Sequence, residues 1–185
     1  MPLRHHAILV VLLALAACSP PVDTAVMPPV SGLVDPDNAI YYANWAFSSP
    51  ARTRNDPASA ARAVAALDYA AGAINTSPRL EFMSPVINDE MLQARVAVRR
   101  VLGIPPTTPS QAVVNSMVTV SLALGSGNRS EALAALNAPI FTLGPEQTLA
   151  VLANMPRVRE ANIATSHAEG AINGTFCALG CLSGG

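Results

Sequence analysis

The sequence predicts an all-α protein, an irregular antiparallel bundle of about five to seven short helices that follows an extended tether. Three observations predict this class. Proline repeatedly follows a residue that commonly precedes a helix, apolar side chains recur at helical spacing after these starts, and no segment alternates apolar and polar residues as a half-buried strand does. The connections between the expected helices are mostly short, which favours neighbouring helices that run up and down.

Proline dipeptides mark the expected helix starts. Proline fits the first helical turn because its missing N–H would have no partner there, and Ser, Thr or Asp before it can accept hydrogen bonds from the free amides. Thr108 and Gln111 also match the capping-box pattern. The dipeptides are Asp35-Pro36, Asp56-Pro57, Ser84-Pro85, Thr108-Pro109 and Gly144-Pro145.

The three longest expected helices carry apolar stripes at the spacing of a core-facing helix side. Shorter helices are expected at 36–47, 129–137 and 145–154, a polar last helix at 157–172, and a short extended link at 138–143. The stripes are Ala60, Val64, Leu67, Ala71 and Ile74 in residues 57–74; Ile87, Met91, Ala94, Val98 and Val101 in residues 85–102; and Val113, Met117, Val120 and Leu124 in residues 109–124.

The N-terminal residues have the organisation of an export signal. Arg4 precedes an apolar run at residues 7–17, which is too short to span a bilayer because a span takes about 20 apolar residues. The run ends in Leu15-Ala16-Ala17-Cys18, which resembles the lipobox of bacterial lipoproteins. This resemblance covers residues 1–18 and implies cleavage before Cys18, a diacylglycerol on its thiol and an acyl chain on the new amino group. The alternative is ordinary secretion with an unmodified cysteine.

The chain divides into four parts by composition. Residues 1–17 are the cleaved signal peptide, and residues 18–34 hold the lipidated cysteine and a flexible proline-rich tether, which allows the domain to stand off from the bilayer by up to about 50 Å. Residues 35–176 form the helical domain and residues 177–185 a C-terminal tail. Ser19, directly after the cysteine, favours the outer membrane by the sorting rule of bacterial lipoproteins, in a periplasm-facing or surface-exposed position.

Charge excludes one class of partner. The chain has 11 Lys plus Arg, all of them arginine, against 12 Asp plus Glu, which gives a net charge of -1. No basic stripe could neutralise phosphates, so nucleic acid is not an expected partner. Charged residues make up 12% of the chain, against about 25% in typical soluble domains. The low charge indicates either a surface that meets protein or membrane, or a GC-rich coding bias.

Cys177 and Cys181 remain as thiols once Cys18 is lipidated. A disulfide between them is the expected state, because an exported protein occupies an oxidising compartment. The alternatives are free thiols and a redox or metal role, although the spacing matches neither a thioredoxin-like nor a haem motif.

His167 is the one histidine of the mature chain, which excludes multi-histidine zinc sites. We expect it on a solvated helix face, and a catalytic base and a pH-sensitive contact are the alternatives. Acidic residues are dispersed, and the glycine-rich residues 125–128 lack the spacing of a phosphate-binding loop. The sequence therefore predicts no catalytic residue, no cofactor and no metal.

Two residue pairs are candidates for an interaction surface. Tyr41 and Trp45 share a helix face at i, i+4 and form either a core anchor or an exposed recognition patch. Arg95 and Arg99 carry like charges at the same spacing. A lipid headgroup, an acidic partner, nearby carboxylates or solvent are the candidates that compensate these two charges.

These observations predict a membrane-anchored, non-enzymatic subunit for interaction or assembly in the bacterial cell envelope, with an envelope protein as its partner. The alternative is a helical carrier of an apolar small molecule such as a lipid or quinone, because flexible methionines can line an adaptable cavity. A hydrolase or redox enzyme is the third hypothesis. The methionines are Met83, Met91, Met117 and Met155.

Overall fold

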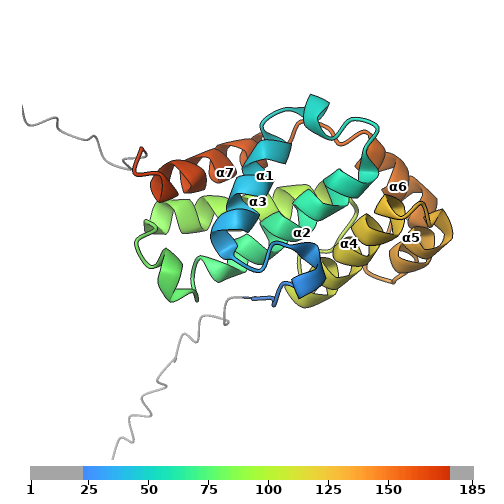
Figure 1. Cartoon of the computed structure of the whole chain (residues 1–185), viewed down its shortest axis with the longest axis horizontal. Coiled ribbons are helices and arrows are strands. Elements are labelled where there is room, and N and C mark those ends of the chain that lie inside the picture. Colours follow the sequence, from blue (N-terminus) through green and yellow to red (C-terminus); the bar gives the residue numbers. More distant parts are fainter. Residues whose placement is uncertain (1–22, 176–185) are drawn as a thin grey trace, which may run out of the picture.

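A computed structural model describes residues 23–175 of the chain (Figure 1). These residues form seven α-helices and three single turns of 3-10 helix, and they contain no strand. The predicted all-α bundle is confirmed, with helix bounds close to those expected. The helices are α1 (Pro36–Phe47), α2 (Pro57–Ala73), α3 (Pro85–Val101), α4 (Ser110–Gly125), α5 (Arg129–Leu136), α6 (Pro145–Ala153) and α7 (Arg159–Ile172), and the 3-10 turns are η1 (Pro29–Ser31), η2 (Pro50–Arg52) and η3 (Pro78–Leu80).

Four predictions concern residues outside the described part of the chain: the signal peptide, lipidation at Cys18, the C-terminal tail at 177–185, and the disulfide between Cys177 and Cys181. Within residues 23–175, none of the helices combines the length and the apolar character needed to cross a membrane. The candidate site and the packing below therefore concern the helical body alone.

The proline-led starts set most helix boundaries. The side chains of Asp35, Asp56 and Ser84 each accept a hydrogen bond from a backbone amide in the first turn of the following helix, at 2.9, 3.0 and 3.4 Å. The predicted capping box at Thr108 and Gln111 is wrong, because α4 begins at Ser110 and its preceding residue, Pro109, gives no side-chain cap. Gln111 instead binds a segment far away in the sequence, described below.

α2 lies at the centre of the bundle (Figure 1), where α1, α3, α4 and α6 all pack against it. Twelve of its 17 residues are buried, and most of these are alanine. A helix that is apolar on all sides belongs in a core, and the small alanine side chains allow neighbouring helices to approach closely. The predicted stripe of α2 is buried along its whole length.

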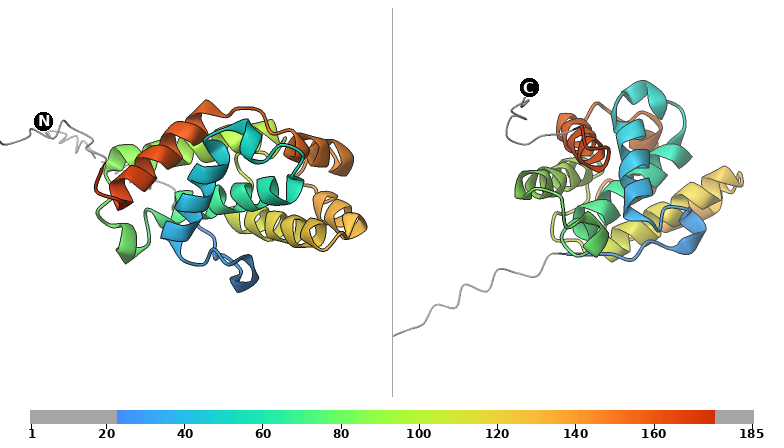
Figure 2. Two further views of the ribbon diagram at one scale, coloured as in Figure 1. Left: turned by 45° about the horizontal axis from the view of Figure 1, so that its top comes forward. Right: turned by 60° about the vertical axis from the view of Figure 1, so that its left-hand side comes forward.

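The other helices extend the bundle on both sides of α2. α7 packs on α3 and α1, and α5 pairs with α4 and with α6 (Figure 2). Residues 138–143, expected as an extended link, form turns instead. The amide of Thr142 there donates to the carbonyl of Gly103 at 3.1 Å, which ties this connection to the end of α3.

The segment before α1 is bound to the helical body, so the prediction of a free tether is wrong for residues 23–34. We call these residues the strap. Met27 and Leu33 are only 1% and 4% exposed, because these apolar side chains insert into the core. Burying them removes apolar surface from water, and this contribution opposes the solvated, extended state that the prolines alone suggested.

Hydrogen bonds fix the strap along its length. The Gln111 side-chain amide pairs with the backbone of Val26, accepting its N–H at 2.8 Å and donating to its carbonyl at 3.0 Å. Arg62 donates to the carbonyl of Ser31 at 2.8 Å, and the Tyr69 hydroxyl donates to the carbonyl of Val34 at 2.7 Å. The Tyr69 pKa is raised, chiefly by burial and also by the nearby charge of Asp35, which keeps the hydroxyl a donor.

Candidate functional site

A network of charged and polar side chains joins the strap to α2, α3 and α4. Its centre is the pair Asp68 of α2 and Arg99 of α3, both 2% exposed. Arg99 Nε and Nη2 donate to the two carboxylate oxygens of Asp68 at 2.8 and 2.7 Å, the bidentate geometry of strong arginine–carboxylate pairs. Its remaining donors reach the carbonyls of Pro106 and Thr108 and the hydroxyl of Ser110. All five guanidinium N–H groups therefore have acceptors.

Asp23, at the start of the strap, completes this network. Its carboxylate accepts from the Ser110 amide at 2.9 and 3.1 Å and from the Ser110 hydroxyl at 2.8 Å. Because Ser110 is the first residue of α4, Asp23 caps that helix from 87 positions away, and its negative charge suits the positive end of the helix dipole. Arg95 donates to the Ser110 hydroxyl and to the Asp23 carbonyl, each at 2.9 Å. We call Asp23, Arg95, Arg99 and Ser110 the strap clamp.

The two positive charges of Arg95 and Arg99 are balanced by the negative charges of Asp23 and Asp68. This balance corrects the prediction that the two arginines form an interaction surface. Burial lowers the pKa of Arg95. Burial also acts to lower the pKa of Arg99, but the hydrogen bond and charge of Asp68, with a contribution from Asp23, outweigh it and leave that pKa raised. The side chains of Arg95 and Arg99 are only 11% and 2% exposed. The predicted interaction surface at these arginines is therefore wrong, because nearby carboxylates compensate them inside the fold.

A second cluster lies on the outer side of α1 and combines aromatic rings with arginines. Trp45 is 38% exposed, and its ring centroid lies 5.4 Å from that of Tyr42 at an interplanar angle of 44°. The guanidinium of Arg52, in η2, lies 5.9 Å from the Trp45 ring centroid, and that of Arg62, in α2, lies 4.6 Å from the Tyr42 ring centroid. Both distances fall within the cation–π range of about 6 Å. We call these four residues the arginine–aromatic row.

The predicted pair of Tyr41 and Trp45 does not act together. The Tyr41 hydroxyl donates to the side chain of Asn173, at the end of α7, at 2.9 Å, so Tyr41 belongs to the contact between α1 and α7. Trp45 pairs with its other neighbour, Tyr42. The core-anchor interpretation of Trp45 is wrong because more than a third of its surface is exposed.

His167 joins α7 to α3. Its Nδ1 lies 2.7 Å from a carboxylate oxygen of Glu90, and the two side chains are 35% and 27% exposed. The position is a half-buried contact between helices, where a fully solvated face was expected. Among residues 23–175, no group of three or more His, Cys, Asp and Glu side chains is arranged to hold a metal ion.

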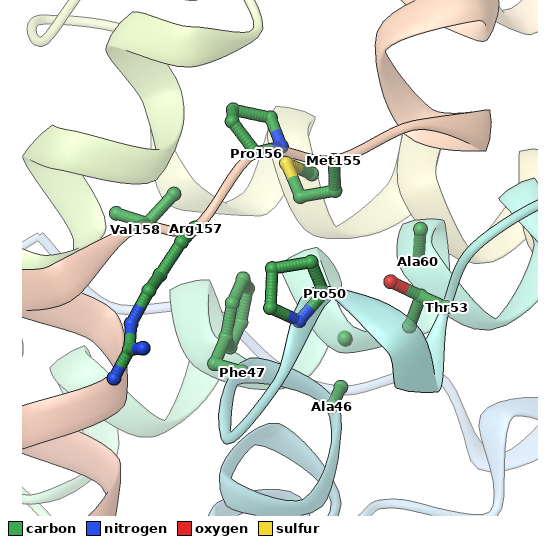
Figure 3. A pocket seen from close by; sticks show the side chains of 10 residues that line it. Ala46, Phe47, Pro50, Thr53, Ala60, Met155, Pro156, Arg157 and Val158 are labelled. Carbon is green, nitrogen blue, oxygen red and sulfur yellow. The ribbon is translucent and has the colours of Figure 1, made fainter.

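One pocket lies between the end of α1, α2 and the connection from α6 to α7 (Figure 3). Phe47, Pro50 and Met155 line it, and its cavity volume is about 10 Å³. That volume suits about one water molecule, whereas pockets for small molecules measure roughly 300 Å³ or more. The four methionines expected around a ligand cavity fill the core instead, with exposed fractions of 6% for Met83, 0% for Met91 and Met117, and 7% for Met155.

Open grooves follow the outer side of α3. Three neighbouring grooves have volumes of 190, 370 and 280 Å³, and they share lining residues from one to the next. Val96, which lines two of them, is 37% exposed, almost the same fraction as Trp45. Val96 therefore serves as a control position whose exposed fraction matches that of Trp45 in the arginine–aromatic row.

Sequence reasoning missed half of the clamp, Asp23 and Ser110, and both arginines of the row. Asp68 did carry a signal, because it is the one charged residue in the otherwise apolar or neutral residues 63–74. Asp23 carried none, since its partner Ser110 is remote in the sequence. Comparisons with protein families, curated proteins and solved structures give no match for this chain.

Proposed function

We propose that this protein is a lipid-anchored, non-enzymatic interaction subunit of the bacterial cell envelope, and that the arginine–aromatic row is its partner-binding surface. The lipobox-like residues 15–18 support the anchor, with the outer membrane favoured by Ser19. The partner is an envelope protein whose contact surface offers apolar and acidic groups to the row.

The observation that carries the proposal is that Trp45 is exposed while its ring contacts Tyr42 and lies near the Arg52 guanidinium. Tryptophan, tyrosine and arginine are enriched among the few residues that dominate the binding energy of protein interfaces. The Tyr42 ring packs against the Trp45 ring, and the Arg52 guanidinium lies 5.9 Å from its centroid. Ordering a side chain before binding lowers the entropy cost of association, so the row is suited to bind a protein without rearrangement.

Site-specific crosslinking in the native bacterium tests this proposal. A photoreactive amino acid replaces Ala51, an exposed residue beside Arg52, and in a second strain it replaces Val96 on the α3 grooves. We expect one discrete crosslinked envelope protein from position 51 and none from position 96. Trp45→Ala abolishes that crosslink, whereas Val96→Ala, at a position of equal exposure, leaves it unchanged.

Two results would overturn the assignment. A partner captured from position 96 alone would place binding on α3. No protein captured from either position, with the full-length chain present in the membrane fraction, would contradict an interaction subunit. Cys18→Ala tests the anchor separately, since this variant should leave the membrane fraction.

A further inference from the structure

After Asp23, the strap and the segment around α4 form a face without charged residues of their own. Residues 24–34 and residues 103–128 contain no Asp, Glu, Lys or Arg. Three large apolar side chains on this face remain exposed, Val26 at 74%, Val30 at 69% and Leu122 at 47%. A groove of about 310 Å³ between Val30 and Leu122 joins the strap to α4, and Arg62 of α2 is the one charged residue that lines it. We call this surface the strap face.

The clamp fixes where the chain enters this face. Asp23 is bound to Ser110 and Arg95, so the strap begins at a defined point on the helical body. Cys18 lies five residues before Asp23. A fully extended chain spans at most about 3.6 Å per residue, so the two residues are separated by no more than about 18 Å. This limit replaces the standoff of about 50 Å expected for a free tether.

We propose that the strap face lies against the lipid bilayer that holds the acyl chains of Cys18. The inference rests on the lipid anchor of the proposed function. The short connection keeps the body beside the membrane, and the strap is where that connection enters. Arg62, the one charged residue that lines the groove, already binds the Ser31 carbonyl and the Tyr42 ring. The face therefore loses less hydration on approaching lipid than a face with several free charges would. Val26, Val30 and Leu122 gain by inserting into the headgroup boundary.

This orientation leaves the Trp45 and Arg52 end of the arginine–aromatic row accessible, whereas Arg62 lines the groove of the strap face. The strap and α7 lie on opposite sides of the bundle in all three views (Figures 1 and 2). η2, which carries Arg52, lies at the far end of α1 from the strap (Figure 1). With the strap face on lipid, the row extends from Arg62 at the strap to Arg52 on the side away from the bilayer.

Tryptophan quenching by brominated lipid tests the orientation. Acylated full-length protein with Trp45→Phe is reconstituted in vesicles of phosphatidylethanolamine and phosphatidylglycerol that contain phosphatidylcholine brominated near the headgroup. A single tryptophan is then introduced as Val30→Trp or Leu122→Trp on the strap face, or as Ser166→Trp on exposed α7. We expect several-fold stronger quenching at positions 30 and 122 than at position 166.

The outcomes separate this inference from the proposed function. The intact mass of the same preparation reports whether Cys18 is acylated, and an unmodified cysteine would overturn the anchor and this inference together. Acylated protein with equal quenching at the three positions, or stronger quenching at position 166, would overturn the membrane-facing surface alone. Blue-shifted emission at position 30 without bromine quenching would show that protein, such as a second copy, covers the face, which would also overturn it.

Discussion

At the residue scale, the buried pair of Asp68 and Arg99 supports the attachment of the strap. Arg99 donates to the Ser110 hydroxyl, which in turn donates to Asp23 of the strap. Transferring two charges from water into a core carries a large desolvation penalty, which their mutual attraction offsets only with good geometry and further hydrogen bonds. Both conditions are met, because the pair is bidentate and Arg99 also binds Ser110. Removing either side chain leaves the charge of the other one buried and uncompensated.

We expect Asp68→Ala to lower the free energy of unfolding by about 3–5 kcal/mol, the range for breaking a buried ion pair from one side. The double variant Asp68→Leu with Arg99→Met should cost less than the single one, since it leaves no unpaired charge. Urea denaturation measures both values. A double variant less stable than Asp68→Ala would contradict this account of the pair.

The surface pair of Arg129 and Glu146 is the control. Its atoms approach to 2.6 Å, as close as those of the buried pair, but both side chains are more than 60% exposed. Solvent screens such pairs, and their contribution is about 0–1 kcal/mol. Glu146→Ala should therefore change the free energy of unfolding by less than about 1 kcal/mol.

At the scale of elements, local signals predicted the helices and failed for the strap. A proline after Asp35 or Asp56 acts on the backbone beside it, so the sequence alone places the helix start. The proline content of residues 18–34 also describes local conformation, and it holds no information about a surface 87 positions away that accepts Asp23. Met27, which is buried, was the signal in the sequence against a free tether, because a large apolar side chain is unfavourable in a solvated segment.

The candidate site also combines a residue that the sequence singled out with contacts that it could not predict. The exposure of Trp45 was one of two interpretations that the sequence left open, because a tryptophan on an amphipathic helix can face either way. Its partner Arg52 is the last residue of η2, and the position of Arg62 over Tyr42 depends on how α2 packs against α1. Such contacts arise from tertiary packing and leave no periodic pattern in the chain.

Gly72 of α2 offers a test of the strap as an element. A Cβ at this position would lie 2.8 Å from the Asp23 carbonyl oxygen and 3.0 Å from the Thr24 Cα, both backbone atoms. The strap would have to move, so we expect Gly72→Ala to destabilise the protein by about 1–3 kcal/mol, as overpacking does. Amide hydrogen exchange within residues 24–34 should accelerate in this variant.

Gly125, at the end of α4, is the matched control. A Cβ there would meet no atom within 4 Å. Alanine favours helix over glycine, so Gly125→Ala should stabilise the protein by about 0.4–1 kcal/mol and leave exchange in the strap unchanged. If both substitutions stabilised the protein equally, the strap would not lie on Gly72.

At the scale of the whole molecule, the clamp would give the proposed lipid anchor at Cys18 a defined orientation. An anchor on a long chain only raises the local concentration of a domain near the membrane, and a flexible linker samples many orientations. With only four residues between Cys18 and a clamped Asp23, an acylated Cys18 would restrict both the height of the body above the bilayer and its rotation. In that orientation, the helical body, and chiefly the length of α1, would determine the distance from the bilayer to the Trp45 and Arg52 end of the row.

Lengthening the connection tests this coupling. An insertion of about twelve Gly and Ser residues between Pro21 and Val22 lets the connection relax to an average span of roughly 5–6 Å times the square root of its length, with many orientations allowed. Because every described contact of the strap lies after the insertion, the free energy of unfolding should not change. Bromolipid quenching of Leu122→Trp should fall toward the value at Ser166→Trp, while the crosslink from position 51 persists. Quenching that stayed at its original strength would mean that the strap face binds lipid by its own affinity, and that the short connection does not determine the orientation.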